Sequence, residues 1–257
     1  MGVLNVTPDS FSDGGLYLDP ARALERAQAM IGEGAAIIDV GGESTRPGAA
    51  PVPPEEELRR VIPVVRALAR EAAIVISVDT SRAEVIEQAI AEGAAIINDV
   101  RALQGRGALA AVARSGAAAC LMHMRGQPET MQQSVHYDDV VGEVRAFLGA
   151  RLASCQEAGI EAVRLCIDPG FGFGKLARHN LELLRNLAEL LELDRPLLVG
   201  LSRKSLLKSL TGRDSDARLA GSIALATAAA LNGAAIIRAH DVAATVDAVR
   251  VAAALKR

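Results

Sequence analysis

The sequence lacks the cysteines needed for a disulfide framework. Its three cysteines, Cys120, Cys155 and Cys166, lie in or beside apolar runs, and an odd, irregularly spaced set is not a disulfide pattern. Thiols in such surroundings are typical of buried, unpaired cysteines. Aromatic residues are also scarce, with no tryptophan, four phenylalanines and two tyrosines, so an aromatic residue in a polar segment is conspicuous.

An excess of one charge is missing as well. The 28 basic and 31 acidic residues give a formal net charge of −3, which argues against the clustered basic excess typical of nucleic-acid-binding proteins. No apolar stretch is long enough to span a membrane, and the first residues lack the charged-then-apolar pattern of a secretion signal. We therefore expect a cytoplasmic protein with neither a nucleic-acid nor a membrane partner.

The sequence does contain a regular alternation of short apolar runs and longer amphipathic segments. This alternation is typical of parallel strands joined by crossover helices. The expected strands are residues 2–6, 35–40, 74–78, 94–98, 117–122, 163–167, 196–200 and 235–238. The chain has 257 residues, of which half are hydrophobic, and contains eight strand–helix pairs. These numbers predict an α/β protein: a (β/α)8 TIM barrel that forms a single domain over residues 1–257.

Local signals mark the ends of several helices. Pro54 and the three glutamates after it are typical of a helix start, where acidic side chains oppose the helix dipole. Ser81 and Glu84 have the spacing of a capping box. The string GAAII occurs three times, and each of its glycines is expected to end a helix in a left-handed turn. These glycines are Gly34, Gly93 and Gly233.

Polar side chains follow the carboxyl ends of the expected strands. In a barrel these ends meet at one rim, which is the catalytic face of this fold. The residues, in strand order, are Asn5, Asp39, Asp79, Asn98, His123, Asp168, Ser202 with Lys204, and Arg238 with His240. Their recurrence at one level of the barrel predicts a single functional site.

Lysine is rare, with four lysines against 24 arginines, yet Lys175 and Lys204 closely follow the sixth and seventh expected strands. A compact ammonium fits a pocket that would not admit a guanidinium, and the alternative is an ordinary surface lysine. Arg238 and His240 follow the eighth strand, so the cations gather where this fold commonly binds phosphate. Ser205 is expected at a helix start, where free backbone N–H groups attract an anion.

The carboxylates and the amide suggest a second binding task. Asp79, Asn98 and Asp168 come from three different strands and have the groups to hydrogen-bond the edge of a flat amino-heterocycle. The alternative is a hydrogen-bonded network in the core.

Two long loops, residues 7–18 and 41–54, are rich in glycine, serine, proline and threonine and are expected to act as lids. Phe11 in the first loop is either a cover for a ligand or a loop anchor. Arg46 in the second either folds over the anion or is a solvated loop charge.

Three familiar motifs fail. Residues 170–175 (GFGFGK) resemble a phosphate-binding loop, but Pro169 replaces the first glycine and Leu176 replaces the required serine or threonine. Residues 200–204 (GLSRK) lack the second glycine of a nucleophile elbow. Cys120 and His123 lack the second ligand pair of a zinc site. We therefore expect no activated covalent nucleophile.

Residues 2–15 (GVLNVTPDSFSDGG) and 39–48 (DVGGESTRPG) closely resemble two signatures of the dihydropteroate synthase family. Shorter matches occur at residues 77–81, 97–99, 122–124, 168–175, 200–205 and 238–241. They cover nearly the whole chain in order. The resemblance implies an enzyme that condenses (7,8-dihydropterin-6-yl)methyl diphosphate with 4-aminobenzoate to give 7,8-dihydropteroate and diphosphate in folate biosynthesis.

The resemblance also implies a role for each matched residue. The pterin would be bound by Asp79, Asn98, Asp168, Lys204 and Arg238, with Arg238 stacked on its face. The pyrophosphate would be held by Asn5 through Mg²⁺ and by Thr45, Arg46, Arg238 and His240. The p-aminobenzoate pocket would be formed by Phe11, Thr45, Pro47, Phe173, Lys204 and Ser205. The catalytic residues would be Lys204, Asp79 and Arg238.

The implied mechanism is SN1-like: pyrophosphate leaves first, aided by Mg²⁺ and the cations, and the arylamine then attacks the pterin carbocation. The resemblance further implies sulfonamide competition and a homodimer packed through the late helices. Family members usually carry a short segment before the first signature, forming a hairpin beneath the barrel. The present sequence starts directly before the first strand, and we expect this to lower stability without removing the site.

Two alternatives stay open on the sequence alone. A pterin-dependent corrinoid methyltransferase domain would have a similar barrel and acidic pterin pocket, but would not need Asn5, Arg46 or the pair of Arg238 and His240 for pyrophosphate. A non-catalytic pterin-binding paralogue would keep the pocket and do no chemistry.

Overall fold

The computed structural model describes residues 1–7, 20–44, 48–49, 51–127, 130–133 and 135–256. Its eight strands are β1 Gly2–Asn5, β2 Ile37–Gly41, β3 Val75–Asp79, β4 Ile96–Asp99, β5 Ala118–Met122, β6 Leu165–Asp168, β7 Leu198–Val199 and β8 Ile236–Ile237. Each overlaps one of the predicted strands. All neighbouring pairs are parallel, in the order β1 to β6 and then β7 to β8.

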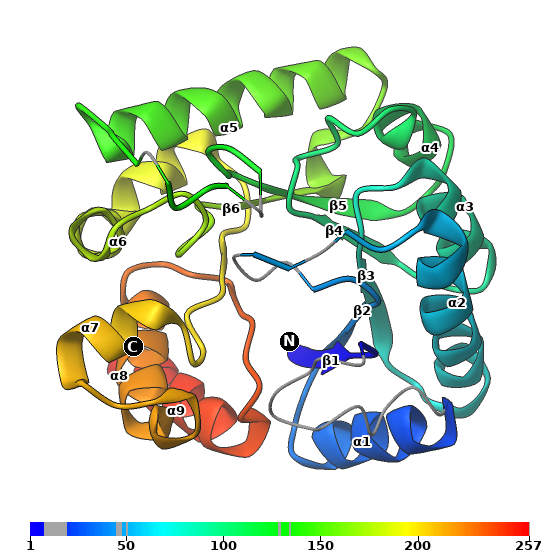
Figure 1. Cartoon of the computed structure of the whole chain (residues 1–257), viewed down its shortest axis with the longest axis horizontal. Helices are drawn as coiled ribbons and strands as arrows, with labels where there is room; N and C mark the ends of the chain where they lie inside the picture. Colours follow the sequence, from blue (N-terminus) through cyan, green and yellow to red (C-terminus); the bar gives the residue numbers. More distant parts are fainter. Residues whose placement is uncertain (8–19, 45–47, 50, 128–129, 134, 257) are drawn as a thin grey trace.

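Two short junctions close these strands into a ring (Figure 1). Isolated parallel bridges join Ile167 to Leu197 between β6 and β7, and Gly2 to Ala239 between β8 and β1. The amide of Val3 also donates a hydrogen bond to the Ala239 carbonyl at 3.0 Å. The predicted (β/α)8 barrel is thereby confirmed.

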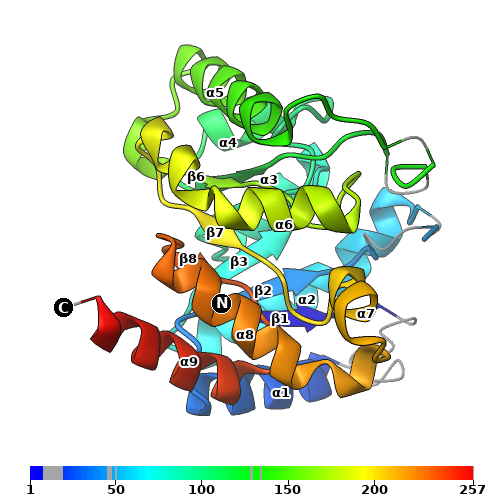
Figure 2. The same cartoon turned by 90° about the vertical axis from the view of Figure 1, so that its left-hand side faces the viewer.

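Helices cover the outside of the ring, as Figures 1 and 2 show. The α-helices are α1 Pro20–Gly32, α2 Pro54–Glu71, α3 Ala83–Ala91, α4 Ala108–Ala113, α5 Val140–Glu157, α6 Ala177–Arg185, α7 Ser205–Thr211, α8 Leu219–Leu231 and α9 Val242–Leu255. The 3-10 helices among the described residues are η2 Ala162–Arg164, η3 Leu187–Leu193 and η4 Ser215–Ala217. Within the described ranges, no helix combines the length and the apolar character needed to cross a bilayer.

The local signals mostly act as predicted. Pro54 is the first residue of α2, and three glutamates occupy its first turn. The three glycines of the GAAII strings adopt left-handed φ angles of 99°, 112° and 101°. The capping box is wrong, because Ser81 donates its hydroxyl to Asp99 and no side chain among the described residues caps α3. A buried carboxylate is a stronger acceptor for a hydroxyl, which explains this choice.

The apolar core lies between the strands and the helices, while the upper interior of the ring is polar. Met30, Ile38, Leu68 and Ile86 are fully buried in the outer layer. Inside the ring, by contrast, Asp39 is 0% exposed. All three cysteines are unpaired, as predicted; Cys120 and Cys155 are buried and Cys166 is partly exposed. A buried carboxylate inside the barrel requires a partner there, and the site supplies one.

Candidate active site

Strand register brings the predicted residues to one rim. Gly41 pairs with Asp79 and Asp79 pairs with Asn98 across β2, β3 and β4. Further round the ring, Met122 at the end of β5 pairs with Asp168 at the end of β6. Because parallel strands end at the same edge, these side chains meet above the barrel axis.

An arginine joins three strands at this rim. Nε of Arg238 donates to Oδ2 of Asp39 at 2.6 Å, and an Nη atom donates to Oδ2 of Asp79 at 3.0 Å. The side-chain amide of Asn98 donates to Asp39 at 3.1 Å. Burial raises the pKa of Asp79, and the charge of Arg238 opposes that rise. Burial alone would lower the pKa of Arg238, but the two carboxylates outweigh burial and raise it.

The space above the barrel axis, between the strand ends, is called the cup below. Lys204 lies across the cup from Arg238 and its two carboxylate partners. Its ammonium donates to the carbonyl of Phe171 and lies 4.6 Å from the ring centre of Phe173. Burial lowers the pKa of Lys204 to about 8, while the charge of Asp168 opposes this lowering. Arg238 and Asp79 also act on the Lys204 pKa, so the charges share one neighbourhood.

Asp168 faces Lys204 from the end of β6. Its Oδ1 accepts a hydrogen bond from the amide of Gly170 at 2.7 Å, and the residue is 6% exposed. Burial raises the pKa of Asp168, and Lys204 opposes that rise. Asp168 and Lys204 are thus neighbouring groups of opposite charge on the side of the cup away from Asp39.

Three further predicted residues, Asn5, Ser205 and His240, lie at or after the ends of β1, β7 and β8. Nδ1 of His240 and the Ser202 hydroxyl lie 3.1 Å apart, which orients the imidazole. Ser205 is the exposed first residue of α7. The side-chain oxygen of Asn5 lies directly beside Gly41. A Cβ added at Gly41 would be 3.4 Å from Oδ1 of Asn5.

Asn5 is also the predicted metal ligand. Mg²⁺ is commonly held by one or two protein oxygens together with substrate phosphates, and the Asn5 amide oxygen fits that donor type. In the described part of the chain, no group of three or more His, Cys, Asp or Glu side chains could form a metal site. Asn5 therefore fits a metal that arrives with a phosphorylated substrate better than one held by a protein cage.

Four predicted site residues lie outside the described residues, namely Phe11, Thr45, Arg46 and Pro47. Their roles stay predictions. His123, predicted at the end of the fifth strand, is described but does not face the cup. It is 4% exposed, and its Nδ1 contacts Lys175.

The chain matches the sequence model of the family described as pterin binding enzyme over residues 1–240. It belongs to this family. The dihydropteroate synthase of Escherichia coli (strain K12) is 55% identical over 251 residues, which cover 98% of this chain and 89% of that protein.

Solved structures agree with this membership. A Yersinia pestis dihydropteroate synthase with a sulfonamide drug complex aligns with a TM-score of 0.98 and 51% identity, covering 100% of this chain and 93% of that one. The dihydropteroate synthase from Xanthomonas albilineans in complex with 7,8-dihydropteroate aligns with a TM-score of 0.90 and 49% identity, covering 100% and 92%.

Two buried residues of this pterin-binding enzyme received no role from the sequence. Asp39 was predicted at the rim, but its pairing with Arg238 was not, since the two are 199 positions apart. The sequence did place the Asp39 carboxylate inside an apolar strand, which indicated that it needs a buried partner. Lys175 was noted for the scarcity of lysine, yet its position, 3% exposed beneath the rim, could not be read from the sequence.

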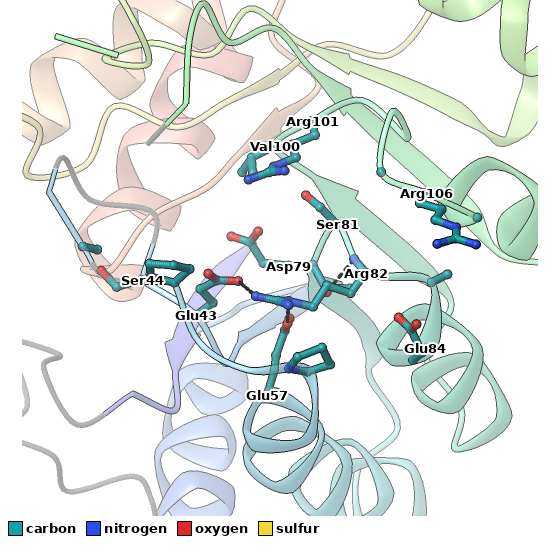
Figure 3. A pocket seen from close by; sticks show the side chains of 17 residues that line it. Glu43, Ser44, Glu57, Asp79, Ser81, Arg82, Glu84, Val100, Arg101 and Arg106 are labelled. Carbon is teal, nitrogen blue, oxygen red and sulfur yellow. Dashed lines mark hydrogen bonds and ion pairs between the residues drawn. The ribbon is translucent and has the colours of Figure 1, made fainter. Parts of the chain in front are cut away.

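A cavity of about 840 Å³ lies beside the cup (Figure 3). Asp79 is the predicted pterin residue on its wall. Arg82, also on the wall, is paired with Glu57 at 2.8 Å and with Glu43 at 3.2 Å. Because Asp79 belongs to both, we interpret the cavity as a sideways extension of the cup, with Arg101 and Arg106 on its far wall.

Proposed function

We propose that this chain catalyses the dihydropteroate synthase reaction, in which (7,8-dihydropterin-6-yl)methyl diphosphate and 4-aminobenzoate give 7,8-dihydropteroate and diphosphate. The observation that carries the proposal is the meeting of Asp79, Asn98, Asp168, Lys204 and Arg238 at one rim of the barrel. Carboxylates suit the amino edge of a pterin, and cations suit a diphosphate leaving group. The 55% identity to the Escherichia coli enzyme supports the same reaction.

The pterin is proposed to bind between the two charged sides of the cup. Asp79, Asn98 and Asp168 accept and donate along its heterocyclic edge, and Lys204 donates from the opposite wall. The guanidinium of Arg238 stacks on the ring face. Its ion pairs with Asp39 and Asp79 support this role, because they fix the guanidinium plane before substrate arrives.

The diphosphate is proposed to lie over the ends of β1 and β8, near Asn5, Arg238 and His240, with Thr45 and Arg46 as further predicted contacts. Asn5 would hold Mg²⁺ at this position, and the ion would supply charge neutralisation for the leaving group. The hydrogen bond between His240 and Ser202 supports the site, since it aims the imidazole.

The arylamine is proposed to occupy the side of Phe173, Lys204 and Ser205, with Phe11, Thr45 and Pro47 as further predicted walls. Sulfonamides would compete for this pocket. The proximity of Lys204 to the Phe173 ring supports a shared wall between the two substrates.

The proposed reaction is SN1-like. The C–O bond to diphosphate breaks first, and Arg238 and His240 stabilise the departing charge. Asp79, Asn98 and Asp168 hold the pterin, whose electron-rich ring stabilises the carbocation. The amine nitrogen then forms the new C–N bond, and its proton passes to the departed diphosphate or to water. The protein orients the partners and excludes water rather than supplying a nucleophile.

Diphosphate release tests the proposal. Release should require the pterin substrate, 4-aminobenzoate and Mg²⁺ together. A methyltransferase domain would release none, and a non-catalytic pterin-binding protein would bind the pterin without release. Either outcome rejects the proposed reaction.

Lys204 supplies the matched variant test. Lys204→Ala should lower turnover by about two to three orders of magnitude with an unchanged fold. The control is Lys208→Ala, because Lys208 lies in α7, which begins directly after Lys204, and pairs with Asp214 at 2.8 Å at the surface. Equal rates for both variants would remove Lys204 from the mechanism.

We also propose one domain over residues 1–257, a cytoplasmic location and a homodimer packed through the late helices. Exposed apolar side chains on α8 and α9, which lie side by side in Figure 2, support the dimer. These are Leu219, Leu231, Val251 and Leu255. Sedimentation of a monomer at micromolar concentration would reject the dimer.

A further inference from the structure

Lys175 is a buried lysine that the proposed chemistry does not use. It ends the GFGFGK segment between β6 and α6, and it is 3% exposed. In a phosphate-binding loop the lysine of this motif reaches outward to a ligand. Here its ammonium turns back onto its own loop.

The contacts of this ammonium are backbone carbonyls and one imidazole. Nζ of Lys175 lies 3.0 Å from the Gly170 carbonyl, 3.1 Å from that of Phe173 and 3.3 Å from that of His123. It also lies 2.8 Å from Nδ1 of His123. Burial, followed by the charge of Lys175, lowers the pKa of His123 to about 2, so the imidazole is neutral and can accept a hydrogen bond.

Four acceptors for three N–H donors saturate the ammonium, so Lys175 has no donor left for a ligand. Burial lowers the pKa of Lys175 well below its usual value. A buried charge of this kind is weak evidence for stability, because desolvation offsets much of what its contacts contribute. A role in shaping the site explains its presence better.

The loop around Lys175 carries the wall next to Lys204. Gly170, Gly172 and Gly174 adopt left-handed φ angles of 67°, 84° and 60°, which lets the chain coil around the ammonium. Between Gly170 and Phe173, whose carbonyls contact Lys175, the Phe171 carbonyl accepts a hydrogen bond from Lys204. The Phe173 ring follows at 4.6 Å from the Lys204 ammonium.

We propose that Lys175 is a positioning residue for the arylamine substrate: by gathering the carbonyls of Gly170 and Phe173, it fixes the Phe173 ring on the arylamine side of Lys204. The inference rests on the proposed arylamine pocket. The scarcity of lysine agrees with it, since a guanidinium is too large and too planar for this cage of carbonyls.

The test compares Lys175→Met with Tyr137→Phe. Methionine keeps most of the side-chain volume and removes the charge. The hydroxyl of Tyr137 donates to the Gly174 carbonyl at 3.0 Å, so its removal deletes one hydrogen bond from the same loop without touching the ammonium. Steady-state KM is measured for each substrate, pterin binding by calorimetry, and the melting temperature for both variants.

Lys175→Met should raise the KM for 4-aminobenzoate by about tenfold or more, while pterin binding stays within about threefold of wild type. Tyr137→Phe should change both by less than about threefold. Equal weakening of both substrates, an unchanged KM, or the same loss in Tyr137→Phe would overturn the inference. If Lys175→Met does not fold, Lys175→Gln, which keeps two donors, is held to the same criterion.

The two failures are distinguishable. A wild-type protein that releases no diphosphate contradicts the proposed reaction. An active wild type in which the Lys175 variants lose no selectivity for the arylamine contradicts only the positioning role.

Discussion

The pKa of Lys204 gives a quantitative test of the site's electrostatics. Burial lowers it from 10.5 to about 8, although the charge of Asp168 works against the lowering. Only the ammonium form carries the positive charge and a third N–H donor beside the ones used by a pterin and the Phe171 carbonyl. The competent fraction should therefore be one half near pH 8 and about a tenth one unit higher.

The assay is the pH dependence of kcat/KM for the pterin substrate at saturating 4-aminobenzoate, because this ratio reports groups of the enzyme before the pterin binds. We expect an alkaline limb centred near pH 8. Lys204→Arg is the control, since a guanidinium stays charged over this range. Its activity should be lower but flat, and a titrating substrate would affect both proteins alike. A shared limb, or none in the wild type up to about pH 10, would refute the reasoning.

The same shift predicts the opposite trend for stability. Between pH 8 and 10.5 the unfolded chain binds more protons at Lys204 than the folded chain does. The contribution of this group to the free energy of unfolding therefore rises with pH through that window and is unfavourable below it. Activity should fall while this stability term improves, and denaturation at several pH values measures it separately.

Three further variants test the packing of the rim and its loops. Asp39→Ala leaves its arginine partner without its closest counter-charge and should cost about 3–5 kcal/mol of unfolding free energy in urea titrations; a loss below about 1 kcal/mol would show that the pair is not buried in solution. Gly170→Ala would place a Cβ 1.9 Å from the His123 carbonyl at a φ of +67°, whereas Gly212→Ala, at φ +70°, meets nothing within 4 Å. Gly170→Ala should lose more than about 3 kcal/mol of unfolding free energy and Gly212→Ala about 1–2 kcal/mol. Equal losses would contradict a clash at Gly170. Asp99→Asn removes a charged acceptor from two backbone N–H groups and should cost about 1–3 kcal/mol in the same titration, so an unchanged midpoint would contradict that role.

The strands were predictable because each is a short apolar run between helices of clear pattern. The glycines that close α1, α3 and α8 were predictable too, since a left-handed turn has few other solutions. The capping box failed because it is a local rule. Ser81 had a partner 18 positions away, the buried carboxylate of Asp99, and only the folded chain brings them together.

In the site, too, the local features were predictable from the sequence and the long-range contacts were not. Its rim residues were predictable from their position at strand ends, and Lys204 from the scarcity of lysine. The pairing of Asp39 with Arg238 was not, because it depends on ring closure between strands at opposite ends of the chain. The inward turn of Lys175 was also hidden, since GFGFGK has the same spacing whether the lysine faces a ligand or its own loop.

The bond between Arg238 and Asp39 spans 199 positions of the chain. Every shorter piece that ends before β8 therefore contains Asp39 and Asp79 without Arg238, and bringing the two carboxylates together without it is opposed by their mutual repulsion. Docking of the last strand removes that repulsion. Binding competence and completion of the fold are then one event, and a pterin added during refolding should report the moment at which the final strand docks.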